Sequence, residues 1–101
     1  MDRGINFKKY YHLFVNLSEG KTGSYKRHEY RKQIFELLAR ELEKNFLYGH
    51  IYAEDIEQVQ RNDYFAKLKV GYYPTMSNDK QYINISFFHD CVQINGLYIT
   101  Y

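Results

Sequence analysis

The side chains best suited to bind an anionic partner lie in the N-terminal third of the chain. Residues 1–32 carry eight basic and three acidic side chains, whereas residues 33–101 carry six basic and nine acidic ones. The candidate partner-binding residues combine positive charge with aromatic rings and are Lys21, Tyr25, Lys26, Arg27, Tyr30, Arg31 and Lys32. Basic side chains bind phosphate or carboxylate groups, and aromatic rings stack on bases or anchor protein interfaces. We expect residues 21–32, named here the basic segment, to contact a macromolecular partner.

Two arginines of the basic segment lie on the helical continuation of an apolar stripe. At about 100° per residue, Arg27 and Arg31 both project within about 60° of Ile34. Because burying an unpaired guanidinium is costly, a polar or acidic group must meet them. That group is either an anion on a partner or a carboxylate of this chain. The carboxylates that we consider within the chain are Glu54, Asp55 and Glu57.

Two short motifs contain reactive residue types but lack parts that catalysis requires. Gly20-Lys21-Thr22 would need a glycine five residues before Gly20 to form a phosphate-binding loop, and Val15 stands there. In His89-Asp90-Cys91, adjacent side chains on a strand point to opposite faces, and no third group orients a base. We expect a buried free thiol at Cys91, which is the single cysteine of the chain. The sequence therefore assigns no catalytic residue, no metal ligand and no cofactor.

A long helix is predicted over residues 25–48. This stretch contains no glycine or proline and is rich in good helix formers. Its apolar residues recur at three- and four-residue steps and are Tyr30, Ile34, Leu37, Leu38, Leu42 and Phe46. Ser24 is suited to cap the N-terminus, and Gly49 is suited to end the helix in the left-handed conformation.

Two shorter segments fit both helix and strand. In residues 10–17 the apolar residues alternate, which favours a strand, although helical spacing also fits this segment. In residues 52–60, helical spacing with Glu54 and Asp55 near the start favours a short helix. A strand that begins at Asp55 is the alternative.

The last forty residues are predicted to form strands. Alternation of residue types predicts strands over residues 64–73 and 82–88, and Pro74 ends the first because it lacks an amide donor. Asn95-Gly96 is a strong signal for a tight primed turn, so residues 92–99 are expected to form a hairpin.

The predicted fold class is α+β, with one long helix over about residues 25–48 packed on an antiparallel sheet of three to five strands. A short second helix is compatible with this arrangement. Residues 1–101 are expected to form a single domain, because a chain of 101 residues with 45% hydrophobic residues can bury a core by itself. No apolar run reaches the roughly 20 residues of a membrane span, so we expect no membrane partner.

The order of strand, helix and strands with a basic face resembles, in outline, the small ribosome-dependent ribonuclease toxins of the RelE type. The residues that carry this resemblance are Lys67, Lys69, Gly71 and Tyr72 in one predicted strand. The resemblance implies an enzyme that cleaves RNA. The chain departs from the pattern where His89-Asp90 stands in place of a basic residue at a strand end. A ribonuclease is therefore the second alternative function.

The favoured interpretation is a small non-enzymatic binding protein that docks on an acidic surface of a protein or nucleoprotein partner. Direct binding of DNA or RNA through the basic segment is the first alternative, although a net charge of +2 is low for a dedicated nucleic-acid-binding protein. Candidate aromatic anchors are Tyr72, Tyr73 and Tyr98. The predicted edge strand 97–101 offers a route to a homodimer.

The composition also bears on the source of the chain. Residues encoded by A/T-rich codons (Phe, Tyr, Met, Ile, Asn and Lys) outnumber those encoded by G/C-rich codons (Gly, Ala, Arg and Pro) by 45 to 15. This bias indicates an A/T-rich genome. We therefore expect an accessory or inhibitor protein of a phage or mobile element, acting in the cytoplasm of the host cell.

Overall fold

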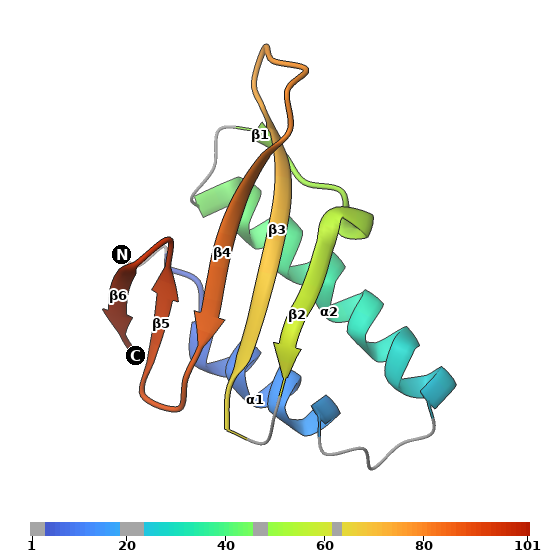
Figure 1. Cartoon of the computed structure of the whole chain (residues 1–101), viewed down its shortest axis with the longest axis vertical. Helices are drawn as coiled ribbons and strands as arrows, with labels where there is room; N and C mark the ends of the chain where they lie inside the picture. Colours follow the sequence, from blue (N-terminus) through green and yellow to red (C-terminus); the bar gives the residue numbers. More distant parts are fainter. Residues whose placement is uncertain (1–3, 19–23, 46–48, 62–63) are drawn as a thin grey trace.

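The computed structural model describes residues 4–18, 24–45, 49–61 and 64–101, and for residues 16–18, 24–27 and 60–61 it describes the backbone alone. Two helices pack on a six-stranded antiparallel sheet, which confirms the predicted α+β fold class (Figure 1). The elements in chain order are α1 (Phe7–Ser18), α2 (Ser24–Asn45), β1 (Gly49–His50), the 3-10 turn η1 (Ala53–Asp55), β2 (Ile56–Arg61), β3 (Ala66–Pro74), β4 (Gln81–Phe87), β5 (Cys91–Ile94) and β6 (Leu97–Thr100).

The sheet is built around β3. Strands β1 and β2 both pair with one edge of β3, and β4 pairs with its other edge. Strands β5 and β6 continue the sheet beyond β4, and every pairing is antiparallel. The sheet has six strands rather than three to five because β1 and β2 form within residues 49–61, where a short helix was favoured.

Residues 10–17 belong to helix α1, so the prediction of a strand there was wrong. Phe7, Tyr10 and Phe14 are spaced by three and four residues, and all three are buried. The Phe14 ring lies 5.5 Å from that of Phe87 and 5.8 Å from that of Phe35. A strand would place Phe7 and Tyr10 on opposite faces, whereas a helix turns all three rings toward the sheet. Burial of the aromatic stripe therefore decides between the two patterns.

Helix α2 confirms the predicted long helix, and the structure describes it from Ser24 to Asn45. Its buried residues are Ile34, Phe35, Leu38, Ala39 and Leu42. Tyr30 and Leu37, which the sequence places in the same stripe, are 48% and 46% exposed. Phe46, the last member of the predicted stripe, lies outside the described residues, as does the side chain of Ser24.

Gly49 does not have the helix-ending role expected from the sequence. Among the described glycines, the one with a positive φ is Gly96. Gly49 instead pairs with Pro74 in the β1–β3 ladder, and a Cβ atom at this position would collide with the carbonyl oxygen of Tyr73. A glycine is needed here because two backbones approach each other closely.

Residues 52–60 form a single turn and a strand, so the favoured short helix was wrong and the strand alternative is correct to within one residue. Turn η1 ends at Asp55 and β2 begins at Ile56. Ile56 is 5% exposed and pairs with Val70 of β3. Pairing with β3 supplies backbone hydrogen bonds and burial that the spacing within this segment does not reveal.

The C-terminal strands follow the predicted pattern. Strand β4 buries Ile83, Ile85 and Phe87, the three residues that the alternation places on one face. The β5–β6 hairpin turns at Asn95 and Gly96, with φ values of 48° and 91°. Positive φ at both central residues is what a type I′ turn requires, and this confirms the predicted hairpin.

The core lies between the helices and the inner face of the sheet. Its largest fully buried side chains are Tyr10, Phe14, Phe87, Leu38, Leu42, Ile51, Leu68 and Ile85. Within the described parts of the chain, no helix combines the length and the apolar character needed to cross a membrane.

Candidate functional site

Three of the candidate binding residues in the basic segment have described side chains, and all three belong to α2. Tyr30 and Lys32 are exposed, and Arg31 is half-buried. The other candidates lie outside the described side chains and are Lys21, Tyr25, Lys26 and Arg27. The prediction that Arg27 and Arg31 both project near the apolar stripe of the helix can therefore be examined for Arg31 alone.

Arg31 reaches from α2 to β2. Its Nε atom donates a hydrogen bond of 3.0 Å to Oε1 of Gln58. The acceptor of this bond is an amide rather than one of the carboxylates considered from the sequence. Asp55, one of those carboxylates, lies 2.8 Å from Nζ of Lys80 instead. Gln58 thus gives Nε of the half-buried guanidinium a polar partner and holds Arg31 against the strand.

A groove of about 360 Å³ lies beside Arg31, between α2 and the η1–β2 segment. Its apolar part is formed by Phe35, Ala53 and Ile56. The rest is lined by His28 and by charged side chains of both signs, which are Arg31, Lys32, Glu36 and Glu54. An apolar floor between mixed charges suits a side chain of a peptide or protein better than a polyanion, which requires positive charge alone.

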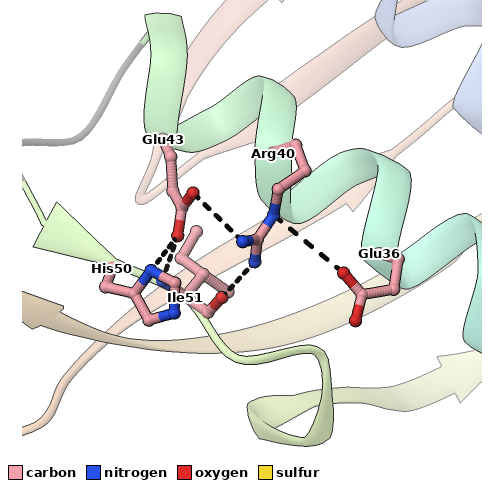
Figure 2. Close-up of polar contacts among 5 residues, drawn as sticks. All are labelled: Glu36, Arg40, Glu43, His50 and Ile51. Atoms are coloured by element: carbon pink, nitrogen blue, oxygen red, sulfur yellow. Dashed lines mark hydrogen bonds and ion pairs between the residues drawn. The ribbon is translucent and has the colours of Figure 1, made fainter.

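A polar network joins the C-terminal half of α2 to the segment that follows it (Figure 2). Oε2 of Glu43 accepts the backbone N–H of Ile51 at 2.6 Å and lies 2.7 Å from Nδ1 of His50. Arg40 donates a hydrogen bond to the carbonyl oxygen of Ile51. Its guanidinium also lies 3.5 Å from Glu43 and 4.0 Å from Glu36. Because these groups bind one another, the network positions the backbone that leads into η1.

One face of the sheet packs against the helices, and no described helix or strand covers the other face (Figure 1). Along β3 and β4, buried residues alternate with accessible ones. The uncovered side carries basic, aromatic and neutral polar side chains, from Phe65, Lys67, Lys69, Tyr82, Asn84, Ser86, Phe88, Gln93 and Tyr98. We name this surface the open sheet face. Lys69 lies beside Asn84 and Lys67 beside Ser86 in the β3–β4 register, so both lysines are central.

Aromatic rings hold the two central lysines. Nζ of Lys69 lies 4.4 Å from the ring centroid of Tyr82, and Nζ of Lys67 lies 5.8 Å from that of Phe65. Attraction between a cation and an aromatic face contributes about 0.5–1 kcal/mol at exposed sites. Tyr82 is 50% exposed, so its ring and the ammonium group of Lys69 are accessible together.

Acidic side chains mark the β2 border of the open sheet face. A shallow hollow of about 300 Å³ is lined there by Lys69, Lys80 and Tyr82 together with acidic residues. The hydrogen bond to Asp55 raises the pKa of Lys80, so this ammonium stays charged and is matched by a carboxylate. Glu57 lies opposite Lys69 in the β2–β3 register. An anionic ligand is therefore better accommodated over β3–β6, which carry Lys67, Lys69 and Tyr82, than over the η1–β2 segment, which carries Asp55 and Glu57.

The three candidate aromatic anchors have different surroundings. Tyr72 is half-buried and packs against the core. Tyr73 contacts the ring of Tyr52 at 5.9 Å and lies below Nζ of Lys80 at the same distance. Tyr98 is 66% exposed on the open sheet face, in register with Gln93. Of the three, Tyr98 has the position that an anchor requires.

The thiol of Cys91 is half-buried and poorly suited to act as a nucleophile. Burial is the main cause that raises its pKa, and the hydrogen bond with Asp90 acts in the same direction. A raised pKa lowers the thiolate fraction, and the thiolate is the reactive form. His89 lies 4.0 Å from Asp90, and both are largely exposed. In the part of the chain that the structure describes, no three His, Cys, Asp or Glu side chains cluster as a metal site.

The sequence prediction of the site missed Tyr82 and Asn84. Alternation in residues 64–73 indicates that Lys67 and Lys69 share one face of a strand. The β3 part of the open sheet face could therefore be predicted from the sequence. The neighbours on β4 depend on the register between strands. That register is not recorded in either strand by itself.

The element order differs from the outline that resembles the RelE-type toxins. Within the described residues the helix α1 precedes α2, where the outline requires a strand. No protein-family model, no curated protein and no solved structure matches the chain.

Proposed function

We propose that this protein is a non-enzymatic binding protein whose open sheet face holds single-stranded nucleic acid. The observation that carries the proposal is the pair of lysines at the centre of an uncovered antiparallel sheet, each in contact with an aromatic ring. Ammonium groups neutralise phosphates, and aromatic rings stack on bases. The face thus offers both of the contacts that a single strand makes with proteins.

The neutral polar residues of the open sheet face support the same proposal. Asn84, Ser86 and Gln93 lie between the lysines and Tyr98. Their amide and hydroxyl groups can both donate and accept hydrogen bonds, as base edges do. A duplex hides the faces of its bases, whereas an unstacked strand exposes them to aromatic side chains. A single strand is therefore the form of nucleic acid that this surface fits.

The experiment measures the fluorescence anisotropy of labelled single-stranded RNA and DNA and of a duplex of the same sequence. Single strands are expected to bind more tightly than the duplex. Each phosphate contact adds about −0.7 to the slope of log K against log salt, so replacing Lys67 and Lys69 by Gln should make the slope shallower by roughly 1.4. Tyr82→Ala is expected to weaken binding by about 1–3 kcal/mol if one base stacks on it.

Lys8→Gln is the matched control, because Lys8 is exposed on α1 and the charge change is the same. This variant is expected to keep the affinity and nearly the whole salt slope of the wild type. The proposal is wrong if single strands do not bind at low salt, or if the Lys67 and Lys69 variants bind as tightly as Lys8→Gln. Thermal unfolding of each variant shows that the fold is retained.

A second candidate function is docking on an acidic surface of a protein through the basic segment. The observation that favours it is the apolar-floored groove beside Arg31 and Lys32. The expected setting is the host cytoplasm, with the chain acting as an accessory or inhibitor protein of a phage or mobile element. If so, the chain should capture a protein partner, and this capture should persist after nuclease treatment. Lys32→Glu should abolish the capture, whereas the Lys67 and Lys69 variants should leave it unchanged.

A further inference from the structure

In the part of the chain that the structure describes, strand β6 forms one edge of the sheet. Among the described strands it pairs with β5 alone, and Leu97 and Tyr98 are 65% and 66% exposed. Residues 97–101 contain neither a charged side chain nor a proline. Such an edge presents unpaired backbone N–H and C=O groups, which favour pairing with a further strand.

Strand β2, at the opposite side of the sheet, carries features that block such pairing. It contains Glu57 and Arg61, and its register with β3 shifts between Gln58 and Gln60. Charged residues and bulges are the devices that keep edge strands from pairing with other chains. The two edges of this sheet therefore differ, and among the described strands β6 is the edge strand that lacks these features.

The turn before β6 determines which of its backbone groups face outward. Ile94 and Leu97 flank Asn95-Gly96 and are directly paired. In a two-residue hairpin with a type I′ turn, these closing residues exchange both of their backbone hydrogen bonds. Leu97 therefore directs its N–H and C=O groups toward β5.

The same alternation continues along β6. Bonded and non-bonded pairs alternate in an antiparallel ladder, so Ile99 bonds to β5 whereas Tyr98 and Thr100 direct their N–H and C=O groups away from it. The N–H of Tyr101 donates to the carbonyl oxygen of Asp90 at 3.4 Å, which agrees with this alternation. The outward groups of Tyr98 and Thr100 are thus the hydrogen-bonding surface of the edge.

We propose that a second copy of the chain pairs with β6 in an antiparallel, two-fold arrangement centred on Ile99. In this register Tyr98 exchanges hydrogen bonds with Thr100 of the second copy, so every outward group of both residues is used. Ile99 then lies opposite Ile99, and Leu97 lies opposite Tyr101 of the second copy. Because the strand is uncharged, the two-fold axis brings no like charges together.

The two-fold axis of this pairing is perpendicular to the sheet. The helices of both copies then lie on one side, and the two open sheet faces join on the other. Tyr98 becomes a central residue of a continuous surface. The proposal stands independently of nucleic-acid binding, because the oligomeric state is measured without a ligand.

Sedimentation velocity over a wide range of protein concentration tests the pairing. The wild-type chain is expected to sediment as a dimer that dissociates on dilution. Thr100→Pro removes an outward N–H and no hydrogen bond to β5, and edge strands tolerate proline, so this variant is expected to be a monomer. Thr100→Val keeps the N–H and is the matched control, which is expected to remain a dimer.

A wild-type chain that is monomeric at every concentration overturns the proposal, and so does a folded Thr100→Pro variant that dimerises like the wild type. If Thr100→Pro does not fold, Tyr98→Lys provides the same test. A lysine on an edge strand opposes pairing by its charge, and Tyr98 is exposed enough for the substitution to leave the monomer intact.

Disulfide cross-linking tests the register. In the proposed ladder the two Ile99 residues form a non-hydrogen-bonded pair, whose Cβ atoms are roughly 4.5–5.5 Å apart and close to disulfide geometry. In a Cys91→Ser background, Ile99→Cys is expected to form a covalent dimer on oxidation. Tyr98→Cys is the control and is expected to cross-link far less, because Tyr98 faces Thr100 of the second copy. Preferential cross-linking at position 98 overturns the proposed register.

Discussion

The contact between Tyr10 and Glu41 gives a direct test of how the two helices are held together. The hydroxyl of Tyr10 donates to Oε1 of Glu41 at 3.0 Å, while its fully buried ring packs near Phe14 and Phe87. Tyr10→Phe removes the hydroxyl and keeps the ring. Hydrogen bonds to charged groups contribute about 1.5–3 kcal/mol, and a half-buried Glu41 regains water in the variant. We therefore expect a loss of about 1–2 kcal/mol in the free energy of unfolding.

The same contact predicts a dependence on alkaline pH. Burial, with the charge and hydrogen bond of Glu41 as further causes, raises the pKa of Tyr10 far above its ordinary value of 10.0. As the pH rises past 10.0, the Tyr10 hydroxyl loses its proton in the unfolded chain but keeps it in the folded chain. The contribution of Tyr10 to stability is thus complete below about pH 10 and is lost as the pH rises further. Tyr10→Phe should make the alkaline loss of stability less steep.

Urea denaturation followed by circular dichroism, at neutral pH and at a series of alkaline values, measures both effects. For a domain of this size, 1 kcal/mol corresponds to a shift of roughly 4–8 °C in Tm, which gives a second readout. Tyr30→Phe removes an exposed hydroxyl and should change stability by less than about 0.5 kcal/mol. If Tyr10→Phe matches the wild type at neutral pH and follows the same alkaline profile, the link to Glu41 does not stabilise the fold.

Three further predictions follow from single contacts. Glu43→Ala leaves the buried N–H of Ile51 without its acceptor. Urea denaturation should therefore show a loss of about 1–3 kcal/mol in the free energy of unfolding, and an unchanged midpoint would contradict this. Gly49→Ala forces a Cβ against the carbonyl of Tyr73. Tm should therefore fall by an amount equivalent to about 1–3 kcal/mol in the free energy of unfolding. A Tm equal to that of the wild type would show that β1 can shift without cost. Cys91 should react with a disulfide reagent several-fold more slowly than a free thiol at neutral pH, because its pKa is raised; reaction at the rate of a free thiol would refute this.

The elements that were predicted correctly are those with a strong local signal. Residues 25–45 lack glycine and proline and have a stripe at helical spacing, which is sufficient to determine α2. Alternation determines β3 and β4, and Asn95-Gly96 determines the hairpin because few other residue pairs adopt positive φ at both positions. These signals act within a few residues of the chain.

The elements that were predicted wrongly are those in which two local patterns compete. The side chains of α1 fit a strand as well as a helix until Phe87 supplies a surface for Phe7 and Phe14. Strand β2 has helical spacing, but its backbone bonds to β3, which follows it in the chain. In each case a distant segment decides, and local propensity is too weak to oppose it.

The candidate site shows the same division. Residue types alone establish that Arg31 needs a polar partner and that Lys67 and Lys69 share a face, because these follow from desolvation cost and from the two-residue period of a strand. Only the tertiary structure decides that the partner of Arg31 Nε is Gln58, that Tyr82 lies under Lys69, and that both helices cover the opposite face. The reason is that periodicity acts along the chain, whereas strand register and helix packing are selected by burial between segments far apart in it.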